Sequence, residues 1–304
     1  MKHFYIPTEL HCEPLTSRRP LADFPVARRR FRDWQNERLA SVGSHEVKEA
    51  KDADFFLQEG AWISHADLKA AMTRRQALVD PKGELIAAWV WNEGCLHGDL
   101  MQGDAFETRD SFAVRYPWDL LRVNEELVGS LSEDRIEGEI HPLAVVEGRI
   151  HLGKGSRLLP GVFIEGNVVI GEGCKIGPNC YLRGNTSIGD KCHVGNAVEI
   201  KNSILLDGTS VGHLSYLGDS ILGTKVNFGA GTITSNLRHD GGNHRSLVGT
   251  ELLDTGRRKL GVIIGDGVHT GINTSFYPGR KMAAGSSTLP GEVVRKDVPP
   301  PARA

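Results

Sequence analysis

The sequence predicts a mainly β fold in which a small N-terminal α/β domain precedes a parallel β-helix of hexapeptide repeats. Two observations predict the β-helix: aliphatic residues recur every six positions through the middle of the chain, and glycine follows many of them. The repeated aliphatic residues are Ile140, Val146, Leu152, Leu158, Ile164, Ile170, Ile176, Leu182, Ile188, Val194, Ile200 and Leu206. A period of six fits neither an α-helix nor an ordinary strand, whereas three hexapeptides close one triangular coil. Each coil contacts only its neighbours and buries its aliphatic residues in a narrow core. A chain of modest hydrophobic content can therefore form a long prism.

Residues 1–116 lack this period and are predicted to form a separate domain. Short apolar runs alternate there with turn sequences, which predicts strands and a few helices, the clearest of them at 66–78. Residues 117–135 have leucines at near-helical spacing. We expect a hinge helix that caps the first coil of the β-helix domain at 136–304.

The composition predicts a soluble protein without a strong net charge. The 304 residues leave room for two domains, and 36 glycines suit a chain that turns every six residues. Lys plus Arg total 36 against 38 Asp plus Glu, so neither nucleic-acid nor membrane binding is expected. The first ten residues lack the apolar stretch of a signal peptide, and the apolar run at 85–91 is too short to span a bilayer. We therefore expect a cytoplasmic protein.

The five cysteines predict neither a metal site nor a disulfide framework. Cys174, Cys180 and Cys192 each stand two positions before a repeat aliphatic residue, in the second inward-facing slot of a hexapeptide. Small thiols in that slot pack as hydrophobic groups. Cys12 and Cys95 are isolated in the sequence, so no bound metal is expected.

The repeat breaks in one zone, where we expect the chemistry to lie. The aliphatic positions slip by one residue at Gly212, and the period stops over residues 234–260 before it resumes at Ile264. The polar, glycine-bearing segment 234–260 cannot sit inside a coil and must loop out from an edge. Loops held by a rigid scaffold commonly carry function.

Polar side chains interrupt the repeat in the same zone. His213 and Tyr216 stand where aliphatic or small residues would pack more easily, and Asn227 and Asn236 flank a Gly-Ala-Gly stretch. A neutral imidazole can take the proton of an attacking amine, amides can orient the reacting groups, and backbone N–H groups can face a developing oxyanion. Such a set is typical of acyl transfer. The alternative is that His213 and Tyr216 merely decorate an outer face.

Long motifs in this zone resemble a known family. HVGNAVEIKNS (193–203) and HLSYLGDSILGTKVNFGAGTITSN (213–236) resemble the acetyltransferase half of bifunctional N-acetylglucosamine-1-phosphate uridylyltransferase/glucosamine-1-phosphate acetyltransferase. RRKLGVIIGDGVHTGINTSFYPG (257–279) is more similar to the archaeal-type sugar-1-phosphate nucleotidylyltransferase/acetyltransferases. The resemblance implies a left-handed β-helix, an exception to right-handed crossovers, that assembles as a homotrimer with active sites between adjacent prisms.

The resemblance also implies roles for individual residues. His213 aligns with the general base for the amino group of a hexosamine 1-phosphate, Asn236 with the asparagine that positions this base, and Ala230 with the N–H that binds the oxyanion. The residues implied in holding the sugar phosphate are Arg183, Lys201, Tyr216 and Asn227. A family lysine is absent, and its substitutes would be Arg258 and Lys259. The residues predicted to bind the acyl donor, acetyl-CoA, are Ala230, Ile272, Ala284, Arg295 and Lys296. The positive charges of Arg295 and Lys296 suit the phosphates of coenzyme A, and the alternative is that these two residues belong to a solvated end coil.

The N-terminal domain departs from the family. A nucleotidyltransferase needs a glycine-rich phosphate loop after its first strand, but this chain has no glycine before Gly43. The segment 13–35 resembles the start of a divergent group of sugar-nucleotidyltransferase-like proteins, although the domain is too short for that fold in full. The resemblance implies a shortened remnant that has lost nucleotidyl transfer.

The sequence therefore predicts an acetyl-CoA-dependent N-acetyltransferase that acts on glucosamine 1-phosphate or galactosamine 1-phosphate. Two alternatives remain open: a non-catalytic trimeric β-helix scaffold or regulator, and an acyltransferase for a different amino sugar. The polar residues that favour an enzyme, because a scaffold has no physical need for polar interruptions, are His213, Tyr216, Asn227 and Asn236. The absent family lysine favours a scaffold.

Overall fold

The computed structural model describes residues 1–89, 105–108 and 110–302. The chain divides into two compact units. The first unit consists of Met1–His11, Pro20–Phe24 and Arg29–Asp119, and the second of Cys12–Arg19, Pro25–Arg28 and Leu120–Ala304. Two short N-terminal segments thus belong to the second unit, which the sequence did not reveal. Among the described residues, no helix is long and apolar enough to cross a membrane.

The first unit is built around a mixed six-stranded sheet in the order β4-β1-β5-β8-β7-β9. Its strands are β1 (Lys2–Ile6), β4 (His45–Glu46), β5 (Phe55–Gln58), β7 (Ala77–Val79), β8 (Leu85–Trp89) and β9 (Ala105–Glu107). A second, small sheet pairs β6 (Ala61–Trp62) with β10 (Phe112–Ala113). Phe55, Trp62 and Leu78 are fully buried, because the short apolar runs of the sequence form the inner strands.

The helices of the first unit are α1 (Phe31–Ala40) and α2 (His65–Arg74). The Ser64 hydroxyl accepts the Asp67 N–H at 3.1 Å and caps the first turn of α2, which confirms the helix predicted at 66–78. The helix ends earlier than predicted because Arg75 takes a left-handed conformation. The remaining short elements near the N-terminus are 3-10 turns at Leu21–Asp23 and Ala50–Asp52 and the strands β2 (Pro25–Val26) and β3 (Arg29–Arg30).

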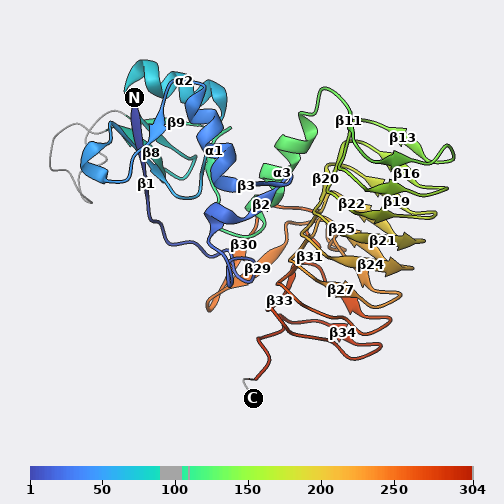
Figure 1. The fold of residues 1–304 in the computed structure, drawn as a ribbon. Coiled ribbons are helices and arrows are strands. Elements are labelled where there is room, and N and C mark those ends of the chain that lie inside the picture. The colour runs from blue at the N-terminus through green and yellow to red at the C-terminus, as the bar shows by residue number, and fades with distance from the viewer. Residues whose placement is uncertain (90–104, 109, 303–304) are drawn as a thin grey trace. The chain divides into compact units, whose positions relative to one another are not determined.

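The second unit is a parallel β-helix of three sheets, which confirms the predicted fold (Figure 1). Sheet I consists of β11 (Arg135–Ile136), β14 (Ile150–Leu152), β17 (Val168–Ile170), β20 (Thr186–Ile188), β23 (Ile204–Leu205), β26 (Ile221–Leu222), β31 (Val262–Ile264) and β33 (Arg280–Met282). Sheet II consists of β12 (Glu139–Ile140), β15 (Arg157–Leu158), β18 (Lys175–Ile176), β21 (His193–Asn196), β24 (Ser210–His213) and β27 (Asn227–Phe228). Sheet III consists of β13 (Val145–Glu147), β16 (Phe163–Glu165), β19 (Tyr181–Arg183), β22 (Glu199–Lys201), β25 (Tyr216–Gly218), β28 (Ile233–Thr234), β32 (Ser275–Phe276) and β34 (Val293–Val294).

The repeat aliphatic residues form the core of the prism. Ile164 pairs with Leu182, eighteen residues later, and Leu182 pairs with Ile200, so equivalent slots stack coil upon coil. All three side chains are fully buried. The inward slots predicted to hold hydrophobic thiols do so, with free side chains at Cys174, Cys180 and Cys192. Cys12 is also buried, whereas Cys95 lies outside the described residues.

The segment that interrupts the repeat loops out of the prism, as predicted. Between β28 and β31 it forms an antiparallel hairpin of β29 (Arg245–Val248) and β30 (Glu251–Asp254). The chain then rejoins the prism, because β31 pairs with β26 in sheet I.

The helix α3 (Asp119–Gly129) lies within the predicted hinge at 117–135, but it does not cap the first coil. Asn124 Nδ2 donates to Asn185 O at 2.8 Å, and Asn167 Nδ2 donates to Val128 O at 3.0 Å. Asn167 and Asn185 lie at the corner where sheet III turns into sheet I, in successive coils. The helix therefore runs along the side of the prism. Its amphipathic spacing reveals a buried face but not what buries it.

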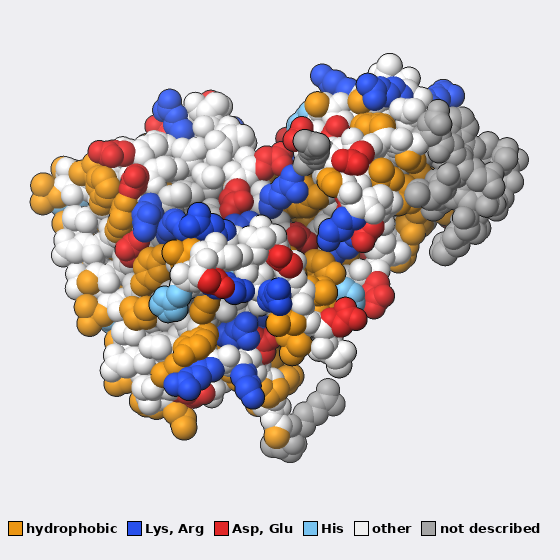
Figure 2. All heavy atoms as spheres, turned by 180° about the vertical axis from the view of Figure 1, so that it is seen from behind, with side chains coloured by type: hydrophobic (Ala, Val, Ile, Leu, Met, Phe, Trp, Pro, Cys, Tyr) orange, Lys and Arg blue, Asp and Glu red, His pale blue; other side chains and the backbone are white. Residues whose placement is uncertain are grey.

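The surface carries charges of both signs. On the face shown in Figure 2, acidic and basic side chains are interspersed, and hydrophobic side chains are exposed between them. This mixture agrees with the near balance of 36 basic and 38 acidic residues in the sequence.

Candidate active site

Most of the predicted site residues fall into two groups within one chain, at opposite edges of sheet III. The first group lies at the corner where sheet II turns into sheet III. The carbonyl of His213 accepts the Gly231 N–H at 3.2 Å, and the carbonyl of Ala230 accepts the Asn273 N–H at 2.8 Å. His213, Ala230 and Ile272 therefore occupy equivalent positions in successive coils.

His213 ends β24, and its side chain is exposed at this corner. A second histidine, His193, lies one coil away. A Cβ at Gly212 would lie 3.8 Å from His193 Cε1, so the His193 ring packs against the backbone that carries His213. Burial, Lys175 and His213 all lower the pKa of His193, which favours a neutral ring. Sequence reasoning missed His193, because its place beside His213 depends on how the coils stack.

The second group lies at the other edge of sheet III, where its strands turn toward sheet I. The buried carboxylate of Asp219 is at its centre. Lys201 Nζ donates to Asp219 Oδ2 at 3.1 Å, and Asn236 Nδ2 donates to the same oxygen at 2.6 Å. Asn236 Nδ2 also donates to the Tyr216 hydroxyl at 3.1 Å. Lys201 and Asn236 thus converge on a carboxylate that sequence reasoning missed, and Tyr216 joins them through Asn236.

Further cations surround this carboxylate. Lys259 lies so close to Lys201 that the Lys201 charge lowers the pKa of Lys259, while Asp219 opposes this shift. Arg183 also contributes to the lowering, and its Nε donates to Glu199 Oε1 at 2.7 Å. Lys259, at the end of the insertion, therefore lies close to the cations of sheet III. It was predicted as a substitute for the family lysine that this sequence lacks.

The other cations of the insertion are engaged elsewhere. Arg257 forms an ion pair with Glu125 of α3 at 2.5 Å, and Glu125 also accepts Asn202 Nδ2 at 2.7 Å. A Cβ at Gly241 would lie 3.6 Å from Arg258 Nη2, so the Arg258 guanidinium stays near its own loop. Of the two predicted substitutes for the absent lysine, Lys259 alone joins the cluster.

The predicted donor residues are not all brought together. The Ile272 carbonyl accepts the Gly291 N–H at 2.8 Å, so the equivalent slot in the next coil is Pro290. Ala284 instead follows β33 at the corner between sheets I and II. Within one chain, Ala284 therefore lies apart from Ala230 and Ile272. The physical reason is that twelve residues advance the chain by only two of the three sides of a coil.

Three other predicted residues are exposed. Asn227 lies on β27 in sheet II, where it pairs with Ser210, and not on sheet III with the cation cluster. Arg295 and Lys296 follow β34, at the edge where the strands of sheet III end. The Arg295 guanidinium carbon lies 5.8 Å from the centroid of the Tyr277 ring.

The predicted hydrogen bond between Asn236 and His213 does not form within one chain. Asn236 lies six residues beyond Ala230, which stacks on His213. At about 3.3 Å per residue, that stretch of strand spans on the order of 15–20 Å. The two side chains are too short to bridge this gap, and Asp219 already holds the Asn236 amide. A contact between them requires a second copy of the chain.

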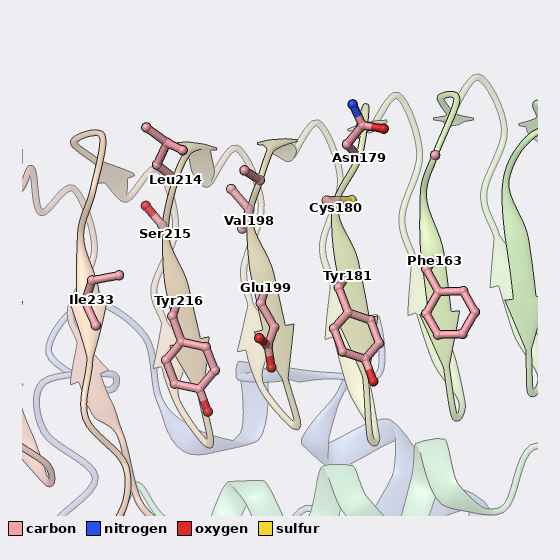
Figure 3. A pocket seen from close by; sticks show the side chains of 12 residues that line it. Phe163, Asn179, Cys180, Tyr181, Val198, Glu199, Leu214, Ser215, Tyr216 and Ile233 are labelled. Carbon is pink, nitrogen blue, oxygen red and sulfur yellow. The ribbon is translucent and has the colours of Figure 1, made fainter.

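A groove lies on the outer face of sheet III, from Leu214 at the His213 corner to Tyr216 (Figure 3). Its volume is about 540 Å³, and side chains of consecutive strands project into it. The rings of Phe163 and Tyr181 lie 5.5 Å apart between centroids. Leu214 is 61% exposed and Ile233 44% exposed, so the groove offers apolar surface. Burial raises the pKa of Tyr216, which keeps its hydroxyl protonated as a hydrogen-bond donor.

Comparisons with known proteins match the same part of the chain. The family model of the GMPPB C-terminal domain matches residues 163–275. A bifunctional sugar-1-phosphate nucleotidylyltransferase/acetyltransferase of Sulfurisphaera tokodaii is 40% identical over 182 residues, which are 60% of this chain and 45% of that protein. The bifunctional protein GlmU of Methanocaldococcus jannaschii is 40% identical over 171 residues, 56% of this chain and 41% of the relative.

Among solved structures, UDP-N-acetylglucosamine acyltransferase from Campylobacter jejuni aligns with a TM-score of 0.31 at 12% identity, over 55% of this chain and 69% of that one. The chain spans less than half the length of the two curated relatives described above. Over its C-terminal part, the chain is a homologue of the bifunctional sugar-1-phosphate nucleotidylyltransferase/acetyltransferases.

Proposed function

We propose that the chain is an N-acetyltransferase that uses acetyl-CoA and an amino sugar 1-phosphate, either glucosamine 1-phosphate or galactosamine 1-phosphate. The observation that carries the proposal is the cluster of Lys201, Lys259 and Arg183 near the buried Asp219. This cluster has a surplus of positive charge, which a sugar phosphate would neutralise through charge-assisted hydrogen bonds. The names of the relatives support the proposal, since they join a sugar 1-phosphate with acetyl transfer.

In the proposed reaction, His213 takes a proton from the sugar amine as its nitrogen attacks the thioester carbonyl of acetyl-CoA. The N–C bond forms, and the Ala230 N–H stabilises the developing oxyanion. The C–S bond then breaks, and His213 returns the proton to the departing thiolate. The products are the N-acetylated sugar phosphate and free coenzyme A, which Ile272, Arg295 and Lys296 would hold.

We also propose that the active assembly is a homotrimer in which His213 of one copy completes the site of another. In these sugars the amino group is bonded to the carbon next to the one that carries the phosphate. The base that deprotonates the amine and the cations that bind the phosphate must therefore lie close to one another. Within one chain, His213 and Asn236 lie on opposite edges of sheet III. Large hydrophobic side chains are exposed along the His213 corner, at Leu143, Leu214, Ile272 and Leu289. Such a row of exposed apolar side chains favours a protein contact there.

We expect the purified protein to acetylate glucosamine 1-phosphate or galactosamine 1-phosphate, with release of free coenzyme A thiol. Because charge-assisted hydrogen bonds contribute about 1.5–3 kcal/mol each, loss of two phosphate contacts should lower kcat/KM by about 10²-fold or more for unphosphorylated glucosamine. Thiol release and mass spectrometry of the sugar measure both quantities. Equal turnover of glucosamine and its 1-phosphate would contradict a phosphate site, and absence of transfer to every amino sugar would favour the scaffold alternative.

We further propose that the N-terminal unit does not transfer nucleotides. The chain that follows β1 has no glycine before Gly43, so it lacks the loop whose N–H groups close around a triphosphate. With UTP, a sugar 1-phosphate and Mg²⁺, we expect no pyrophosphate above background. An authentic uridylyltransferase in the same assay provides the positive control. Pyrophosphate release that depends on the sugar phosphate would contradict this expectation.

A further inference from the structure

We infer that Asp219 is a positioning residue of the anion site: its carboxylate holds Lys201 and Asn236 in the arrangement that receives the phosphate of the sugar. This inference rests on the proposed function for the identity of the ligand. It concerns a residue that lies within the motif at 213–236 but to which neither the hexapeptide period nor the resemblance assigns a role. Three features of the second unit support it, and each depends on a different physical property of Asp219.

The first feature is the complete pairing of a buried charge. Asp219 is 3% exposed, and its Oδ2 accepts Lys201 Nζ at 3.1 Å and Asn236 Nδ2 at 2.6 Å. Its Oδ1 accepts Asn202 Nδ2 at 3.0 Å. Both oxygens are therefore engaged, and two of the three donors are residues proposed to act on the substrate. A buried carboxylate without such donors would be strongly destabilised, so these donors are held firmly.

The second feature is the backbone at this corner. Gly184, Asn202 and Asp219 occupy equivalent positions in successive coils. The Asn202 N–H donates to the carbonyl of Arg183, just before Gly184, and the Asp219 N–H donates to the carbonyl of Lys201, just before Asn202. All three adopt positive φ, at +65° for Gly184, +46° for Asn202 and +49° for Asp219.

Glycine takes this conformation at no steric cost, whereas residues with a Cβ are strained there, Asn and Asp less than others. At this corner, Asn202 and Asp219 replace the glycine of the earlier coil, and their side chains join the cation cluster. Residues such as Lys191 and Lys225 adopt positive φ at other turns of the prism, so the feature that sets this corner apart is the contact between the two side chains.

The third feature is the balance of charge around the two lysines. Lys201 and Lys259 repel one another, and Asp219 is the carboxylate that opposes the lowering of the Lys259 pKa. The other charged and titratable groups of the neighbouring elements are Arg183, Glu199, Tyr216, Glu125 and Arg257. Without the Asp219 charge, the pKa of Lys259 would fall further, or its side chain would move away from Lys201. Either response removes a cation from the place where the phosphate binds.

The test compares Asp219→Asn, which removes the charge, with Asp219→Gly, which also relieves the strained backbone. Lys225→Gly is the matched control, because Lys225 has a φ of +56° at another turn of the prism, outside the cluster. We expect both Asp219 variants to raise the KM for the sugar phosphate roughly 10- to 100-fold, the effect of losing a hydrogen bond to a charged group. The KM for acetyl-CoA should stay the same, and Asp219→Gly should melt no lower than Asp219→Asn.

The pH dependence gives a readout that a structural role would not change. Phosphate binding requires protonated lysines, and removal of the Asp219 charge lowers the Lys259 pKa further. Affinity should therefore be lost at a lower pH in Asp219→Asn than in the wild-type chain as the pH rises. Calorimetric titration with glucosamine 1-phosphate across this pH range measures the shift without any need for turnover.

The outcomes separate this inference from the proposed function. If the wild-type chain binds the sugar phosphate but both Asp219 variants bind it as tightly and with the same pH dependence, Asp219 is not a positioning residue. If Lys225→Gly raises the KM for the sugar phosphate as much as Asp219→Gly does, the cause is the introduction of glycine into a turn and not the loss of the Asp219 carboxylate. That result also overturns the inference. If the wild-type chain binds no sugar phosphate at all, the proposed function fails, and the inference about its ligand fails with it.

Discussion

The variant His213→Ala is expected to transfer acetyl groups about 10²- to 10⁴-fold more slowly than the wild-type chain, the usual contribution of a positioned general base. The imidazole is the group at the corner shared with Ala230 that can accept the proton of the attacking amine. Its side chain is exposed at the end of β24, outside the aliphatic core. The substitution should therefore lower kcat and leave the melting temperature nearly unchanged.

A matched control is available on the same face of the prism. His269 is an exposed histidine that has no proposed role in the reaction. Its backbone pairs with Asn227 of β27, and β27 in turn pairs with β24. We expect His269→Ala to keep near wild-type turnover when both substrates are saturating. Full turnover in His213→Ala would mean that another group is the base, with the half-buried His193 as the next residue to test.

The architecture of the second unit was predictable because one sequence property determines it. A hexapeptide period brings every third repeat into the same slot, so Ile164, Leu182 and Ile200 must stack on one another. The polar interruptions at Tyr216 and Asn236 were visible for the same reason, since they stand out against a regular background. The structure adds that both belong to one hydrogen-bonded cluster.

Other features depend on three-dimensional relations that the period does not contain. Asp219 stands in a segment that looks like an ordinary turn, and its importance appears only when its slot is compared with Asn202 one coil earlier and Gly184 two coils earlier. Ala284 and Ile272 were both predicted to bind the acyl donor, and the sequence does not show that they lie at different corners of the prism. The helix α3 shows an apolar face in sequence, but its polar contacts with Asn185 reveal that it lies along the prism.

Mixing two inactive variants is expected to restore activity, because the proposed site combines residues from two copies. In His213→Ala the base is lost, and in Asn236→Ala the amide beside Asp219 is lost, so each homotrimer should be nearly inactive. The two edges that carry these residues lie on the order of 15–20 Å apart within one chain. A mixed site is intact when the Asn236→Ala copy supplies His213 and the neighbouring His213→Ala copy supplies Asn236.

The measurement is the acetylation rate of glucosamine 1-phosphate after the two variants are unfolded together and refolded as mixed assemblies. With equal amounts and random assembly of a cyclic trimer, about a quarter of the sites should contain both intact residues. We therefore expect recovery to roughly a quarter of the wild-type rate, while each variant refolded alone stays at its own low rate. A mixture that remains as inactive as the separate variants, although light scattering shows that mixed trimers have formed, would contradict a site shared between copies.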